Sequence, residues 1–138
     1  MGRVINPDSS GKERTKLTKS IVKAIRQLMN QSRPDQITKD LAAFIAIGLQ
    51  DIYLTVDVSV EAWEKRGYWV KADRFRLDWE WTKEYSNQMK EAIRHEDWAN
   101  VAMVAAKTAQ KLNNIKIGEK NRIGEPWHGA YQLLINQK

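Results

Sequence analysis

The chain has 138 residues, of which 42% are hydrophobic, with 23 Lys and Arg, 17 Asp and Glu and no cysteine. This length and composition predict one folded domain, and the lack of cysteine excludes disulfides, thiolate metal sites and cysteine nucleophiles. The longest hydrophobic stretch, 41–60, contains Asp51 and Asp57, and residues 1–14 hold no apolar signal-peptide core. We therefore expect a cytoplasmic protein with no membrane contact.

Charge is segregated along the chain. Residues 1–33 contain eight Lys and Arg against two acids, residues 34–64 contain six acids and one Lys, and residues 65–138 contain fourteen cations and nine acids. Two explanations are open: the basic segments bind an anionic partner, or the basic first helix is neutralised by the acidic second helix inside the fold.

The first half of the chain predicts an irregular arm over residues 1–9, which precedes a single helical domain over residues 10–138. Ser10 and Glu13 form an S-x-x-E capping box, which predicts a helix that starts near Gly11. Ser32, with Pro34 in the first turn, predicts the start of a long second helix that continues to Gly67. Its segment 53–60 is rich in β-formers, so a strand is the alternative there, but helical spacing on both sides favours helix.

The second half predicts three more helices. Apolar residues at alternating spacings of three and four predict a helix over about 68–94, and Asp97 is the expected N-cap of an alanine-rich helix. A polar loop follows over 113–125, and Pro126 is expected to open a short last helix. Because the connections are short, we predict an all-α fold: an antiparallel four-helix bundle with a long central helix pair and a short C-terminal helix.

The first candidate site is a row of cations in the first helix, the basic ridge. Spacings of four and three residues place its members on one helix face over about 21 Å. Such a row suits the phosphates of a nucleic acid; the alternative is a solvated face, or one docked on the acidic second helix. The ridge consists of Lys12, Lys16, Lys19, Lys23 and Arg26.

The second candidate is the aromatic and basic tract 63–81. Aromatic rings can stack on bases while cations hold the backbone, although core packing of Phe75 and Trp79 is the alternative, with ion pairs from Arg74 to Asp78 and Arg76 to Glu80. With Arg3 and the basic ridge, the predicted nucleic-acid contacts are Arg66, Trp69, Lys71 and Arg74, and the predicted protein interface is Leu77, Trp81 and Tyr85.

A third basic tract runs from the fourth helix into the loop: Lys107, Lys111, Lys116, Lys120 and Arg122. It would extend the ridge if the two segments meet in space. Lysines near a helix C-terminus also interact favourably with the helix dipole, and this explanation is preferred.

Catalytic patterns are missing from the sequence. The only histidines, His95 and His128, lie far apart, and Glu91 with His95 has no second Glu-x-x-His partner for a di-iron site. Residues 6–13 lack the first glycine and the Ser or Thr of a phosphate-binding loop. We therefore expect no enzyme, no cofactor and no metal.

The segments GRVINPDSSGKERTKL, AWEKRGYWVKADRFRLDWEW and EPWHGAYQLL resemble parts of a family of small helical bacterial proteins with no assigned function. That resemblance implies no site or activity. In size and basic character the chain is also similar to small helical subunits of RNA-guided effector complexes. The charge pattern predicts binding to nucleic acid or a nucleoprotein complex, largely independent of base sequence. The alternative is a scaffold or self-associating protein, a homo-oligomer with no nucleic-acid role.

Overall fold

The computed structural model describes residues 7–137, which form one short 3-10 helix and five α-helices. No strand occurs within this range, so the all-α prediction is confirmed, and residues 53–60 are helical. The elements are η1 (Pro7–Ser9), α1 (Ser10–Met29), α2 (Gln36–Lys65), α3 (Trp69–Arg94), α4 (Trp98–Lys111) and α5 (Ala130–Asn136).

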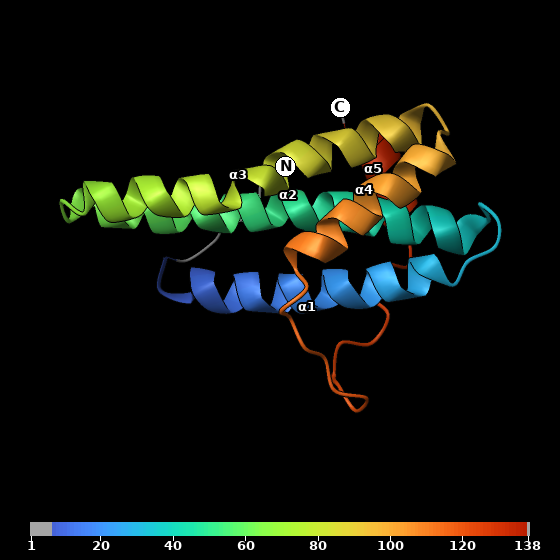
Figure 1. The fold of residues 1–138 in the computed structure, drawn as a ribbon, viewed down its shortest axis with the longest axis horizontal. Helices are drawn as coiled ribbons and strands as arrows, with labels where there is room; N and C mark the ends of the chain where they lie inside the picture. The colour runs from blue at the N-terminus through green and yellow to red at the C-terminus, as the bar shows by residue number, and fades with distance from the viewer. Residues whose placement is uncertain (1–6, 138) are drawn as a thin grey trace.

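Helix α2 lies at the centre of the molecule. Helices α1 and α3 run along it on two sides, while α4 crosses in front and α5 lies behind (Figure 1). Because α2 and α3 are both long, their connected ends project as a hairpin beyond the start of α1 (Figure 1). We call residues 63–78 the hairpin tip.

The central position of α2 follows from its sequence. Its buried face carries fully buried aliphatic side chains, and Gly48 lets α1 approach closely, since a Cβ there would lie 2.9 Å from Cδ1 of Ile21. By length and composition alone α2 could also cross a membrane, with a mean hydropathy of 1.6 over its most apolar window. The other helices bury 56% of that window, as expected for the core helix of a helical domain.

Two hydrophobic cores lie along α2. The larger includes buried side chains from all five helices, such as Ile21, Leu49 and Leu134. The smaller lies between α2 and α3 within the hairpin, where Val56 and Val60 pack against Ala72. Aromatic side chains cover the smaller core, so this part of the molecule depends on rings that are only partly buried.

Two helix starts differ from the sequence prediction. Helix α1 begins at Ser10, with Ser9 as N-cap, because the Ser10 hydroxyl is buried and hydrogen-bonded to the Ser59 hydroxyl at 2.7 Å. Helix α2 is capped by Asp35, not Ser32: the Asp35 carboxylate accepts a hydrogen bond from the Thr38 N–H at 3.0 Å, which also lowers the pKa of Asp35. A carboxylate satisfies free N–H groups at a helix start well, so it displaces the serine.

The last two helices also test the prediction. Asp97 caps α4 as expected and accepts a hydrogen bond from the Asn100 N–H at 3.1 Å. Helix α5 begins only at Ala130, because residues 126–129 form a turn and Gly129 has a positive φ of 82°. Pro126 therefore opens this turn and not the helix.

Candidate polyanion-binding groove

The α4–α5 loop, residues 112–129, brings the last three cations of the third basic tract, Lys116, Lys120 and Arg122, close to α1. Because α4 crosses in front of α2 and α5 lies behind it, the loop passes around α1, and it projects beyond α1 on the side away from α2 (Figure 1). This path places loop residues 116–126 opposite Lys16 and Lys19.

A groove of about 620 Å³ separates the loop from α1. Its lining combines five cations with a hydroxyl, an amide and three apolar side chains, and it contains no carboxylate. The two acids of the loop segment, Glu119 and Glu125, are exposed but do not line the groove. The lining residues are Lys16, Lys19, Ser20, Lys116, Ile117, Gly118, Lys120, Asn121, Arg122, Ile123 and Pro126.

One ridge residue ties the loop to α1. The Lys23 ammonium donates a hydrogen bond to the Gly124 carbonyl at 2.6 Å and contacts the Asn121 side-chain oxygen at 3.5 Å. Asn121 in turn donates to the Gly118 carbonyl and accepts from the Ile123 N–H, at 3.0 and 3.1 Å. Lys23 therefore holds the loop that forms the far wall of the groove.

The loop is also anchored where it enters α5. Trp127 is 2% exposed and packs edge-on against Phe44, with ring centroids 6.5 Å apart. The buried carboxylate of Asp40 on α2 accepts hydrogen bonds from the N–H groups of Gly129 and Tyr131, at 3.2 and 3.0 Å. Asp40 thus caps the first turn of α5 from a distant part of the chain.

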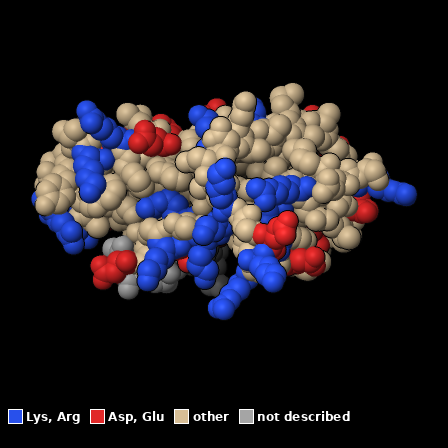
Figure 2. Space-filling model, turned by 60° about the horizontal axis from the view of Figure 1, so that its bottom comes forward, with Lys and Arg blue, Asp and Glu red and all other residues tan. Residues whose placement is uncertain are grey.

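The structure places the predicted ridge on the surface, with differences among its members. Lys12, Lys16, Lys19 and Arg26 are exposed and Lys23 is half-buried. Figure 2 shows Lys and Arg side chains gathered over the middle of this face, with acids scattered around them. Two ridge lysines line the groove, Arg26 borders a smaller hollow of about 170 Å³, and the predicted contact Arg3 lies outside the described residues.

Several acids of α2 lie beside other helices than α1. Glu64 pairs with Arg76 of α3 at 3.7 Å, in place of the predicted pair between Arg76 and Glu80. Asp57 has a pKa raised by burial, an effect opposed by the nearby charges of Arg76 and Lys83 on α3. With Asp40 committed to α5, these three acids serve contacts away from the basic ridge.

Arg14 is an α1 cation outside the predicted ridge, and it lies on another face of the helix. Its guanidinium donates a hydrogen bond to the Thr55 hydroxyl at 3.1 Å and lies over the ring of Phe75, 4.7 Å from the centroid. Burial lowers the pKa of Arg14. Arg14 lies two residues from both Lys12 and Lys16, so helical periodicity places it on a different face of α1 from the ridge. This offset is the sequence signal for its inward position.

At the hairpin tip, the predicted second contact zone is exposed. The side chains of Trp69 and Val70 are 60% and 69% exposed, and Arg66, Lys71 and Arg74 are exposed beside them. Lys71 lies over the ring of Trp63, 4.4 Å from its centroid, and a shallow hollow of about 490 Å³ lies beside these residues. The tip therefore combines exposed cations with aromatic rings.

The predicted interface row is split by the fold. Leu77 is 70% exposed, whereas Trp81 and Tyr85 are half-buried and pack against the larger core. Trp81 stacks on Trp79 with centroids 6.2 Å apart, and Lys107 of α4 lies over the Tyr85 ring at 4.7 Å. Both aromatic residues therefore contribute to packing within the chain.

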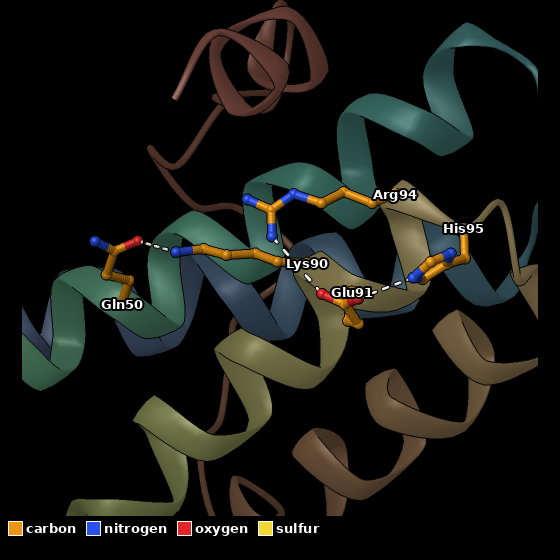
Figure 3. A network of polar contacts seen from close by, with 5 residues as sticks. All are labelled: Gln50, Lys90, Glu91, Arg94 and His95. Carbon is orange, nitrogen blue, oxygen red and sulfur yellow. Dashed lines mark hydrogen bonds and ion pairs between the residues drawn. The ribbon is translucent and has the colours of Figure 1, made fainter. Parts of the chain in front are cut away.

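A cluster of titratable groups at the end of α3 has a structural explanation. His95 contacts Glu91 at 2.9 Å and Arg94 contacts it at 3.8 Å, while Lys90 donates to Gln50 of α2 (Figure 3). Burial lowers the pKa of Lys90, as does the charge of Arg94. Cations at a helix C-terminus interact favourably with its dipole. Among residues 7–137, no three His, Asp or Glu side chains are grouped as metal ligands.

The groove cations of the loop are predicted by the sequence only as an extension of the ridge. Lys116, Lys120 and Arg122 lie on irregular backbone, so no periodicity predicts which way they face. The preferred dipole explanation does not apply to them, because α4 ends at Lys111.

No family model, curated protein or solved structure matches this chain.

Proposed function

We propose that the protein binds nucleic acid, free or in a nucleoprotein complex, through phosphate contacts in the groove between α1 and the α4–α5 loop. The observation that carries the proposal is the convergence of five cations from two distant segments on one hollow without a carboxylate. A cluster of this kind attracts a polyanion and gains free energy from released counterions. Lys12 extends the same charged surface towards the N-terminus of α1.

Recognition in this proposal is largely independent of base sequence. Lysine and arginine side chains on a helix face and a loop bind phosphate oxygens, which carry no sequence information. The hairpin tip is a second, weaker contact zone, in which Arg66, Lys71 and Arg74 meet phosphates and Trp69 stacks on a base. We expect neither enzymatic activity nor a bound cofactor.

The arrangement of helices is part of the proposal. We classify α1 to α4 as an antiparallel four-helix bundle, with α5 as a C-terminal addition. Packing of α4 against both α3 and α1 supports this classification. In such a bundle the outer face of α1 stays available to a partner. We further propose that the protein acts in the cytoplasm.

Self-association through the hairpin tip is the second candidate function. Its support is the exposure of Trp69, Val70 and Leu77, because large exposed apolar side chains are typical of protein interfaces. Light scattering of the purified protein tests it: a stable oligomer that Leu77→Arg dissociates supports this function, and a monomer at every concentration contradicts it.

Binding of the purified protein to a labelled oligonucleotide tests the main proposal. Fluorescence anisotropy at about 50 and about 200 mM salt should show affinity that falls as salt rises. If about five phosphates are neutralised, log affinity against log salt has a slope of about −3.5 on single strands. Absence of binding to DNA and RNA at the lower salt would contradict the proposal.

A further inference from the structure

The loop that completes the groove also limits what can approach α1. An α-helix with its side chains is about 10–12 Å across and fills a DNA major groove, which is about 12 Å wide. The α4–α5 loop adds to α1 on its outer side, as its projection in Figure 1 shows. Helix and loop together are therefore too wide to enter the major groove of a duplex.

The lining of the groove has two chemical characters. Its cations suit phosphate oxygens, whereas Ile117, Ile123 and Pro126 provide apolar surface. Base faces can cover apolar side chains only where bases are unstacked, as in a single strand. A bare polyphosphate has no group to cover these three residues.

The tie between the loop and α1 keeps this shape. Lys23 donates to the Gly124 carbonyl at 2.6 Å, and Gly124 itself has a positive φ of 68°, a backbone conformation that favours glycine. Lys23 is thus a positioning residue for the loop, while Lys16 and Lys19 face the groove.

We propose, on the basis of the function proposed above, that the groove selects single-stranded over double-stranded nucleic acid, and that Lys23 maintains this selectivity by holding the α4–α5 loop across α1. The backbone of the single strand runs between Lys16 and Lys19 on α1 and the loop cations, and unstacked bases cover the apolar lining. A duplex reaches only the outermost cations.

The test uses one labelled DNA strand, alone and annealed to its complement, with the full-length protein. We expect the single strand to bind about tenfold more tightly than the duplex. Lys23→Met should reduce this ratio to about two, since the loop is released, and Lys23→Arg should keep it, since an arginine still donates to the Gly124 carbonyl. Thermal unfolding of each variant checks that the fold is intact.

Lys12→Met is the matched control, because it removes one ridge charge at a residue outside the groove lining. This variant should weaken the binding of both ligands by the same factor and leave the ratio of single-strand to duplex affinity unchanged. Equal affinity of the wild-type protein for the two ligands, or the same ratio in Lys23→Met as in Lys12→Met, overturns the inference alone. Absence of binding to either ligand overturns the proposed function as well. Inorganic polyphosphate should compete more weakly than an oligonucleotide of equal charge, and equal competition also counts against the inference.

Discussion

In the groove, five lysine and arginine side chains from two segments line one hollow, whereas the hollow at the hairpin tip is lined by two cations beside aromatic rings and the acid Asp78. Lys71 lies over Trp63, and Asp73 and Asp78 are exposed nearby. The groove lining contains no acid. Cations that line the same hollow reinforce one another's potential, while an acid in the lining opposes it. We therefore expect the groove to bind a polyanion more tightly than the hairpin tip.

The strongest way to break this comparison is to reverse three charges in each region. Lys16→Glu, Lys19→Glu and Lys120→Glu together should weaken single-strand binding by about 100-fold or more, since about three phosphate contacts are lost and become repulsive. Arg66→Glu, Lys71→Glu and Arg74→Glu together change the net charge by the same amount and should weaken single-strand binding by less than about tenfold. Anisotropy at fixed salt measures both. Equal losses would show that binding follows net charge and not the groove.

A second prediction compares two cations of α1 by protein stability. Arg14→Met removes the contacts with Thr55 and Phe75 and should lower the free energy of unfolding by about 1–2 kcal/mol. Lys16→Met, on the exposed face, should change it by less than about 0.5 kcal/mol. Urea unfolding followed by tryptophan fluorescence measures both. A similar loss in the two variants would contradict the inward role of Arg14.

The smallest expected effect concerns Asp57 at the base of the hairpin. Its pKa is raised above the ordinary 3.8, chiefly by burial, so the folded state holds this proton to a higher pH than the unfolded state does. The contribution of Asp57 to stability therefore falls as pH rises from about 3.8 to the raised pKa, and stays unfavourable above it. Asp57→Asn should raise the urea midpoint slightly at about pH 7 and not at about pH 3. Glu80→Gln, on the exposed surface of α3, is the control.

Much of the fold follows from the sequence because periodicity and caps are local signals. The approximate extents of α1 to α4 and the cap at Asp97 are predictable from apolar spacing and turn chemistry, although α2 is capped by Asp35 and not by the predicted Ser32. Helix starts are less predictable where a side chain has a distant partner. The Ser10 hydroxyl bonds to Ser59, so no local pattern shows that it is unavailable as a cap.

The site is only half predictable for the same reason. Regular spacing along the sequence is enough to place Lys16 and Lys19 on one helix face. Lys116, Lys120 and Arg122 lie on a loop whose path depends on Lys23, Asp40 and Trp127. Because these contacts join residues that are distant in the sequence, by 101 positions for Lys23 and Gly124 and by 89 for Asp40 and Gly129, the sequence offers no periodic signal for them.

The capping of α5 by Asp40 has a consequence for the order in which the protein matures during synthesis. Lys16 and Lys19 are synthesised before Gly129 and Tyr131, and the C-terminal end of the opposite wall is fixed to α2 only when these two later residues reach Asp40. A fragment that stops before Gly129 therefore keeps the contact between Lys23 and Gly124 but lacks the attachment of the loop to α2. Under the proposed function, we expect such a fragment to discriminate less sharply among polyanions than the full chain.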